Sequence, residues 1–220
     1  MPYAGSLLVK QLGLQPYAAT WQAMQAYTDQ RTPDSQDQLW LLEHPPIFTL
    51  GQAGKPEHLL NPGEIPVIRT DRGGQVTYHG PGQLVAYLML DLRRASIGVR
   101  GLVTVLEEAV IDLLAQRGIE AAARRDAPGV YVAGAKIASV GLRVRHGCSF
   151  HGLSLNVEMD LEPFQRINPC GYPGLSVTQV KDHTKDCDLH EIGRDLSHHL
   201  TRGLGYTLTF ASPDPTEMIP

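Results

Sequence analysis

The middle of the chain is a series of short apolar runs interrupted by glycine and proline, and this pattern limits the fold more than any other feature. Each run is rich in Val, Leu, Ile or Tyr and is bounded by turn-forming residues, which indicates a β-strand. We predict strands at residues 67–70, 75–78, 84–92, 130–133, 136–144 and 150–157, and outside this region at 6–12, 38–43, 47–50 and 206–210. A sheet is therefore expected at the centre of the fold.

Helical spacing of apolar residues is confined to a few segments. It predicts helices at residues 16–31, 99–117 and 188–202. The second of these has one apolar stripe, formed by Val103, Leu106, Val110, Leu113 and Leu114. Glu107 is predicted to lie off this stripe, and Gly118 and Gly203 are predicted to end the second and third helices. A few helices around a central sheet predict an α/β (α+β) fold, with a mixed β-sheet flanked by helices.

Length and composition are those of an ordinary globular protein. The chain has 220 residues, of which 42% are hydrophobic and 19% charged, and one α/β domain can be this long. No internal repeat or low-complexity linker divides the sequence. We expect a single domain over residues 1–212 and a proline-containing tail over residues 213–220.

Charge and cysteine usage narrow the class of protein. The formal net charge of -4 argues against a globally basic surface, so no nucleic acid partner is expected. The early apolar stretch at residues 7–9 is too short for a signal peptide or a membrane span, which predicts a cytoplasmic protein without a membrane partner. The odd number of cysteines, 3, suits free thiols in a reducing compartment.

The segment 72–83 reads RGGQVTYHGPGQ and combines glycines with polar side chains. Its small residues would let a ligand approach backbone N–H groups, and Arg72, Thr77, His79 and Gln83 add side-chain donors. A tight hairpin that merely requires glycine would explain the paired glycines equally well. The polar residues favour a binding groove.

Cys170 lies between proline and glycine in the sequence NPCGYPG, where no regular helix or central strand can form. A thiol on such a loop is expected to be accessible, whereas Cys148, beside a predicted strand, has the character of a buried structural cysteine. Cys187 falls in a polar stretch with His183 and His190. A zinc site would need a fourth ligand, which this stretch lacks, so no metal is expected.

A cysteine nucleophile acts as its thiolate, and at an ordinary pKa of about 8.5 little thiolate exists at neutral pH. A cation near Cys170 is therefore expected. Lys136 is a candidate because it begins a strand of small and apolar residues, KIASVG, where a lysine is unusual. By periodicity alone, a lysine that extends its ammonium from the end of a strand into solvent is the better explanation of the position.

Four motifs together closely resemble the lipoyl(octanoyl) transferase family, which is related to the catalytic domains of biotin and lipoate protein ligases. They are RGGQVTYHGPGQ at 72–83, Lys136 followed by ASVG at 138–141, HGL at 151–153 and NPCG at 168–171. The resemblance extends from the first predicted strand to about residue 210. It implies transfer of an octanoyl (or lipoyl) group from acyl carrier protein to a lysine of lipoyl domains, as in 2-oxo acid dehydrogenases and the glycine-cleavage H protein. It implies an acyl-thioester intermediate and no cofactor.

The resemblance also implies which residues act. Cys170 matches the cysteine that carries the acyl group, and Lys136 matches the lysine that lowers the pKa of this thiol. The residues implied to bind substrate are Arg72, Gly73, Gly74, Gln75, Val76, Thr77, Tyr78, His79, Ser139, Val140, Gly141, Gly152, Leu153 and Ser154. We further expect Lys136 to serve as the base for the incoming lysine once Cys170 is acylated and has lost its charge.

Other functions remain open on the sequence alone. An ATP-dependent lipoate or biotin ligase would use a similar groove and lysine but would need no cysteine. A module that only binds lipoyl domains would not depend on Cys170, and a thiol hydrolase would call for a histidine partner. For docking of an acidic carrier protein, the candidate cations are Arg69, Arg93, Arg94, Arg143 and Arg145.

Overall fold

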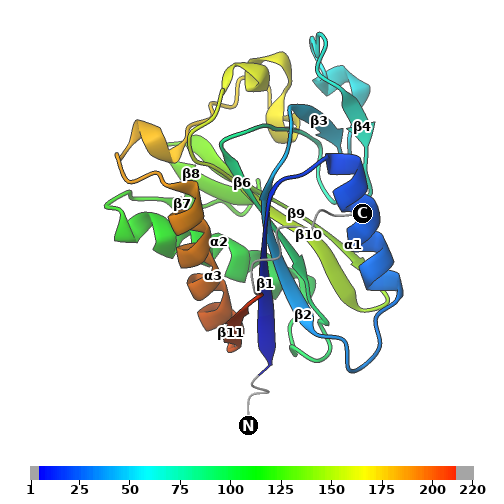
Figure 1. Ribbon diagram of the computed structural model, residues 1–220. Helices are drawn as coiled ribbons and strands as arrows, with labels where there is room; N and C mark the ends of the chain where they lie inside the picture. Colours follow the sequence, from blue (N-terminus) through cyan, green and yellow to red (C-terminus); the bar gives the residue numbers. More distant parts are fainter. Residues whose placement is uncertain (1–4, 212–220) are drawn as a thin grey trace.

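The computed structural model describes residues 5–211. Within them the chain forms an eight-stranded sheet, a three-stranded sheet and three α-helices (Figure 1). The strands are β1 (Ser6–Leu14), β2 (Asp37–Glu43), β3 (Ile47–Leu50), β4 (Val67–Arg69), β5 (Val76–His79), β6 (Gln83–Met89), β7 (Ala122–Ala123), β8 (Gly129–Val132), β9 (Ala135–Arg145), β10 (Cys148–Asn156) and β11 (Thr207–Phe210). The helices are α1 (Tyr17–Asp29), α2 (Val99–Gln116) and α3 (Leu189–Leu204). Short 3-10 turns occupy η1 (Pro56–His58), η2 (Glu162–Arg166), η3 (Pro169–Gly171) and η4 (Val180–Asp182).

The large sheet has the strand order β11-β1-β2-β6-β10-β9-β8-β7. It is mixed, because β1 runs parallel to β2 and β11 whereas the other pairs are antiparallel. The small sheet has the order β4-β3-β5. These findings confirm the predicted fold class and most of the predicted strands. The tail predicted at residues 213–220 lies outside the described residues.

Helices cover both faces of the large sheet. On one face α2 and α3 pack side by side, and their leucines join Leu39, Leu88 and Leu153 of the sheet in the largest buried cluster. The other face is covered by α1 (Figure 1), whose Met24 joins a smaller cluster of sheet residues. The central strands β2, β6 and β10 are buried almost throughout because both of their faces are covered.

The corner at His44-Pro45-Pro46 moves the chain from one sheet to the other. Strand β2 lies inside the large sheet and β3 in the small one, since proline cannot continue a ladder of hydrogen bonds. The small sheet carries a third cluster, in which Phe48 and Tyr78 pack against Phe164. It thereby places the loop between β4 and β5 beside β9, where Gly73 N donates a 2.9 Å hydrogen bond to Leu142 O.

Two predictions about helices were wrong. Gly203 does not end α3; Gly205 does, with a φ of 67°. Gly203 stays helical and allows close packing, because a Cβ there would lie 3.0 Å from Val105 Cγ1 on α2. Glu107 does not lie off the apolar face of α2 but is buried, with 9% of its surface exposed.

Candidate active site

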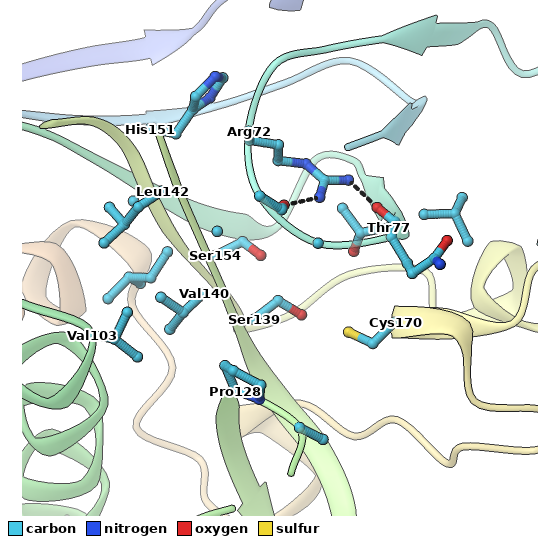
Figure 2. A pocket seen from close by; sticks show the side chains of 18 of the residues that line it. Arg72, Thr77, Val103, Pro128, Ser139, Val140, Leu142, His151, Ser154 and Cys170 are labelled. Carbon is cyan, nitrogen blue, oxygen red and sulfur yellow. Dashed lines mark hydrogen bonds between the residues drawn. The ribbon is translucent and has the colours of Figure 1, made fainter. Parts of the chain in front are cut away.

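A cavity of about 340 Å³ lies where the small sheet, β9, β10 and α2 meet. Figure 2 shows Cys170 and Thr77 on one side of it, Val103 and Leu142 on the opposite side, and Ser139 and Ser154 between them. The volume falls in the range of about 300–1,000 Å³ that is typical of small-molecule sites. Its lining is mainly apolar at the α2 end and mainly polar at the Cys170 end.

Cys170 lies in the 3-10 turn η3 with left-handed backbone angles, φ 56° and ψ 17°, and Gly171 follows with φ 81°. A left-handed cysteine is strained, and such strain is concentrated at functional sites. Two turn hydrogen bonds hold the conformation, from Gly171 N to Asn168 O at 2.9 Å and from Tyr172 N to Pro169 O at 3.0 Å. The thiol is partly exposed and lines the cavity, as expected from its position between proline and glycine.

Lys136 reaches Cys170 from β9. Its Nζ donates to Cys170 Sγ at 2.9 Å and to the carbonyl oxygen of Pro128 at 2.8 Å. Only 2% of the residue is exposed, and Nζ lies 5.3 Å from the centre of the Tyr131 ring. The lysine therefore does not extend into solvent; it is buried with its ammonium against the thiol. An ammonium at this distance stabilises the thiolate.

Arg72 shapes the glycine loop from behind. Its guanidinium donates to the carbonyl oxygens of Gly73 at 2.9 Å and Gln75 at 2.8 Å (Figure 2), and also to that of Thr49 at 2.7 Å. Burial lowers the pKa of Arg72, while the nearby Cys170 opposes this change. Because these donors are directed at its own chain, Arg72 acts mainly by fixing the loop from Gly73 to Gln75 against the cavity.

Glycines in the floor of the cavity permit close approach of neighbouring strands. At Gly152 on β10, a Cβ would collide with the carbonyl oxygen of Ala86 on β6. At Gly141 on β9, a Cβ would lie 3.2 Å from the carbonyl oxygen of Gly73. The glycine loop can therefore lie directly over β9, which leaves the serine side chains of both strands facing the cavity beside it.

Buried neutral histidines lie under the polar end. Burial lowers the pKa of His79 to about 3 and that of His44 to about 4. His79 Nδ1 pairs with Gln83 Oε1 at 2.7 Å, and the amide of Gln83 donates in turn to Asn156 Oδ1 at 2.9 Å. His79 and Gln83, which were expected to donate hydrogen bonds to a ligand, thus use part of their hydrogen-bonding groups inside the fold. A neutral His79 is suited to binding rather than to carrying protons at neutral pH.

His151 is turned toward the cavity by its backbone. It has a φ of 60° in the middle of β10, and its Nε2 donates to Asp71 Oδ1 at 3.0 Å. Strict alternation would place it on the α2 face with Leu153, yet it contacts Tyr87 of the opposite face. Burial would raise the pKa of Asp71, but hydrogen bonds from His151 and Trp21 bring it down to about 2.

The structure gathers most of the residues predicted for the site. The cavity is lined by Arg72, Gly73, Gly74, Gln75, Val76, Thr77, His79, Ser139, Val140, Gly141, Gly152, Leu153, Ser154 and Cys170. Tyr78 is not among the lining residues, because alternation along β5 turns its ring into the cluster with Phe48. Lys136 does not line the cavity either, but it touches the thiol that does.

Sequence reasoning missed the apolar end and part of the rim. The cavity is also lined by Tyr17, Val85, Tyr87, Val99, Val103, Asp126, Ala127, Pro128, Leu142, His151 and Tyr172. Val103 was assigned to the apolar stripe of α2, a signal that was correct for hydrophobicity but could not separate a cavity wall from the core. His151 belongs to the motif HGL at 151–153, which points to this position but does not predict its contact with Asp71.

Two absences concern the described part of the chain. Residues 5–211 contain no group of three His, Cys, Asp or Glu side chains placed to hold a metal ion, which includes His183, Cys187 and His190. In the same residues no helix combines the length and the hydropathy that crossing a bilayer requires.

Comparison with known proteins assigns the family. The sequence matches the lipoyl protein ligase A/B catalytic domain over residues 16–201, which is most of the chain. The chain belongs to this family. Members similar to it are the octanoyltransferases of Pseudomonas entomophila, 64% identical over 92% of this chain and 94% of the relative, and of Stutzerimonas stutzeri, 65% identical over 90% of each.

Solved structures of other proteins share the fold. A lipoate-protein ligase A bound with ATP superposes with a TM-score of 0.77 at 16% identity, covering 96% of this chain and 90% of that one. A biotin protein ligase from Aquifex aeolicus gives a TM-score of 0.54 at 14% identity, covering 90% and 68%. At these identities the likeness concerns the fold, as the resemblance in the sequence implied.

Proposed function

We propose that the chain is an octanoyltransferase that carries its acyl group as a thioester on Cys170. The observation that supports this most directly is the 2.9 Å contact between Lys136 Nζ and Cys170 Sγ at the edge of the cavity. Relatives of more than 60% identity over nine-tenths of the chain bear the name octanoyltransferase. The donor is an octanoyl thioester of acyl carrier protein and the acceptor a lysine of a lipoyl domain.

In the first half-reaction the thiolate of Cys170 attacks the carbonyl carbon of the donor thioester. A bond from Sγ to carbon forms, the bond to the donor sulfur breaks, and the released thiolate takes up a proton. One thioester replaces another, so the step requires no ATP. Lys136 stabilises the attacking thiolate through the contact described above.

In the second half-reaction the amine of the acceptor lysine attacks the thioester. A carbon–nitrogen bond forms, the bond to Sγ breaks, and the amine loses a proton as the amide is made. Acylation removes the negative charge from Sγ, which leaves the Lys136 ammonium without this partner and favours release of its proton. Neutral Lys136 then accepts the proton of the incoming amine. This restores the Lys136 ammonium beside the Cys170 thiolate that the broken bond releases.

The apolar end of the cavity is suited to the hydrocarbon chain. Val99 and Val103 of α2 line it together with Val140 and Leu142 of β9. Removing apolar surface from water at such a wall contributes about 0.8 kcal/mol per CH₂ group. The thioester carbonyl then lies at the Cys170 end, next to the polar loop that Arg72 holds.

Some of the arginines that the sequence suggested for docking of the acidic carrier protein are already paired with carboxylates. Arg94 forms an ion pair with the buried Asp37 at 2.6 Å, and Arg145 pairs with Asp29 at 2.9 Å. The loop 124–128 lies nearer to the reaction, since its last residues line the cavity. The exposed Arg125 of this loop is therefore the better candidate for a contact with an acidic carrier, since Arg124 is itself paired with Asp126 at 2.8 Å.

An ATP-dependent ligase is the alternative from the same family, since a related structure contains ATP. A ligase activates a free acid and has no use for a cysteine, whereas here a buried lysine is directed at one.

We place the reaction in the cytoplasm, because the three cysteines form no disulfide in the described chain and such thiols persist in reducing compartments.

The test is intact-mass spectrometry after incubation with octanoyl-acyl carrier protein in the absence of ATP. We expect the wild type to gain one octanoyl group that hydroxylamine removes, and the Cys170→Ala variant to gain none. Cys187→Ala, which removes another partly exposed thiol, is the matched control and should behave as wild type. A wild type without an adduct, or with an adduct that survives in Cys170→Ala, would refute the thioester on Cys170.

A further inference from the structure

Glu107 is a carboxylate buried on the apolar side of α2. Val110, its neighbour one turn later on the helix, is fully buried, and only 9% of Glu107 is exposed. Burying an ionisable group costs free energy unless a hydrogen bond or an opposite charge compensates for it. Its compensating partners therefore indicate what the residue is for.

One peptide group connects Glu107 to Lys136. Glu107 Oε1 accepts a 2.7 Å hydrogen bond from Gly129 N, and the carbonyl oxygen of the same peptide unit, that of Pro128, accepts 2.8 Å from Lys136 Nζ. The carboxylate pulls on the N–H end of this peptide while the ammonium binds its oxygen. Each bond polarises the peptide so that the other is strengthened.

The geometry of Gly129 leaves little freedom in this connection. Its φ of 132° is a value that side chains rarely allow, and a Cβ there would lie 2.7 Å from Lys136 Cε. The lysine side chain therefore runs directly over Gly129 toward the thiol. If the peptide turned, both the Pro128 oxygen and the path of the lysine would shift.

Charge gives a second link between Glu107 and Lys136. Burial raises the pKa of Glu107, and the Gly129 hydrogen bond and the charge of Lys136 both oppose this rise. The groups that face the Lys136 ammonium are Cys170 from η3, Tyr131 from β8 and Glu107 from α2. When Cys170 is a thioester or a neutral thiol, Glu107 remains as an anion that can balance the buried ammonium.

We propose that Glu107 is a positioning residue that holds Lys136 against Cys170 through the Pro128–Gly129 peptide and sets the pH at which Lys136 acts as a base. The proposal rests on the roles given above to Cys170 and Lys136. Glu107 touches neither substrate nor thiol and acts through the lysine alone.

Two substitutions separate the hydrogen bond from the charge. Glu107→Gln keeps an oxygen that accepts from Gly129 N but removes the charge, whereas Glu107→Ala removes both. Without the negative charge the neutral amine of Lys136 is favoured, so the pH limb of the second half-reaction moves to lower pH in both variants, by roughly half a unit to one unit. Without the hydrogen bond the peptide is released, so the plateau rate falls in Glu107→Ala only, by about tenfold or more.

The experiment measures transfer of octanoyl from preformed acyl-enzyme to a lipoyl domain in single turnovers between pH 5.5 and about 9.5, an interval chosen to span ordinary protein pKa values. Mass spectrometry first establishes the adduct on Cys170; its absence in the wild type would overturn the proposed function and this proposal with it, whereas an acylated enzyme whose pH limb does not respond to Glu107 overturns this proposal alone. Glu108→Gln, the exposed neighbour on α2, is the control and should keep the wild-type limb and plateau.

A merely structural glutamate would lower the plateau without moving the limb. The proposal is therefore overturned if Glu107→Gln keeps the wild-type pH limb, or if its plateau is as low as that of Glu107→Ala. Because glutamine has the same shape as glutamate, the first comparison remains decisive even if Glu107→Ala does not fold.

Discussion

At the scale of the residue, the site depends on one buried ammonium beside one strained cysteine. Flanking proline and glycine predicted an accessible Cys170, and its partly exposed thiol at the cavity confirms that. The left-handed backbone of Cys170 and the 2.9 Å approach of Lys136 could not be predicted, since the two residues are 34 positions apart. Glu107 was misplaced for a similar reason: the N–H that it binds comes from the first residue of β8, 22 positions away.

Replacing Lys136 tests its two proposed roles separately. Arginine keeps the positive charge but does not act as a base at neutral pH, so Lys136→Arg should retain more of Cys170 acylation than of transfer to the acceptor. Lys136→Ala should lose both, by about 100-fold or more in each half-reaction. Rapid-quench mass spectrometry of the two half-reactions measures this, with thermal denaturation to confirm folding. Wild-type rates for both steps in Lys136→Ala would eliminate the dual role.

At the scale of the element, α2 serves both the core and the cavity. Its later turns, with Leu106, Val110 and Leu113, belong to the large buried cluster, while Val99 and Val103 line the cavity. Periodicity predicted the apolar stripe correctly but treats all its members alike. Whether an apolar residue meets a packed neighbour or an open cavity depends on β9 and the glycine loop. Periodicity could not predict the role of Gly203 either, because Val105, against which it packs, lies on another helix.

A larger side chain at Val103 should shorten the preferred acyl chain. Val103→Phe places an aromatic ring in the apolar end, so kcat/KM for octanoyl-acyl carrier protein should fall relative to that for the hexanoyl thioester by about tenfold or more, within the range that a few methylenes provide. Steady-state kinetics with both donors measures the ratio. Thr104→Phe adds the same ring at an exposed position and should leave the ratio unchanged. An unaltered ratio in Val103→Phe would remove this wall from the acyl site.

At the scale of the whole molecule, the pairing of strands that are far apart in the sequence decides the arrangement of the sheets, which local patterns do not predict. Strand positions were readable, but the division of β2 and β3 between two sheets and the order of eight strands depend on contacts between distant segments. Asp37 is an example: it accepts from Arg31, Arg94 and Tyr206 and so joins both ends of the chain to the middle. No local pattern predicts such a cluster.

Stability should fall on mild acidification. In the unfolded chain a histidine has a pKa of about 6.5, whereas in the folded protein that of His44 is about 4 and that of His79 about 3. The unfolded state therefore binds more protons below pH 6.5, and the free energy of unfolding decreases from pH 6.5 down to about 4. Chemical denaturation across this interval measures the slope. His44→Gln should reduce this slope, and replacement of the exposed His198 by Gln should not. Equal slopes in the wild type and both variants would contradict the low pKa of His44.

The guanidinium of Arg72, bonded to three carbonyl oxygens of its own chain, means that the loop over the reaction centre is already in shape before any acyl group arrives. Little conformational entropy then remains to be lost when substrate enters. Under the proposed function, a carrier-bound thioester and an acceptor lysine would then bind in turn at the same preformed loop. Reorganisation of this loop is therefore not expected to limit turnover.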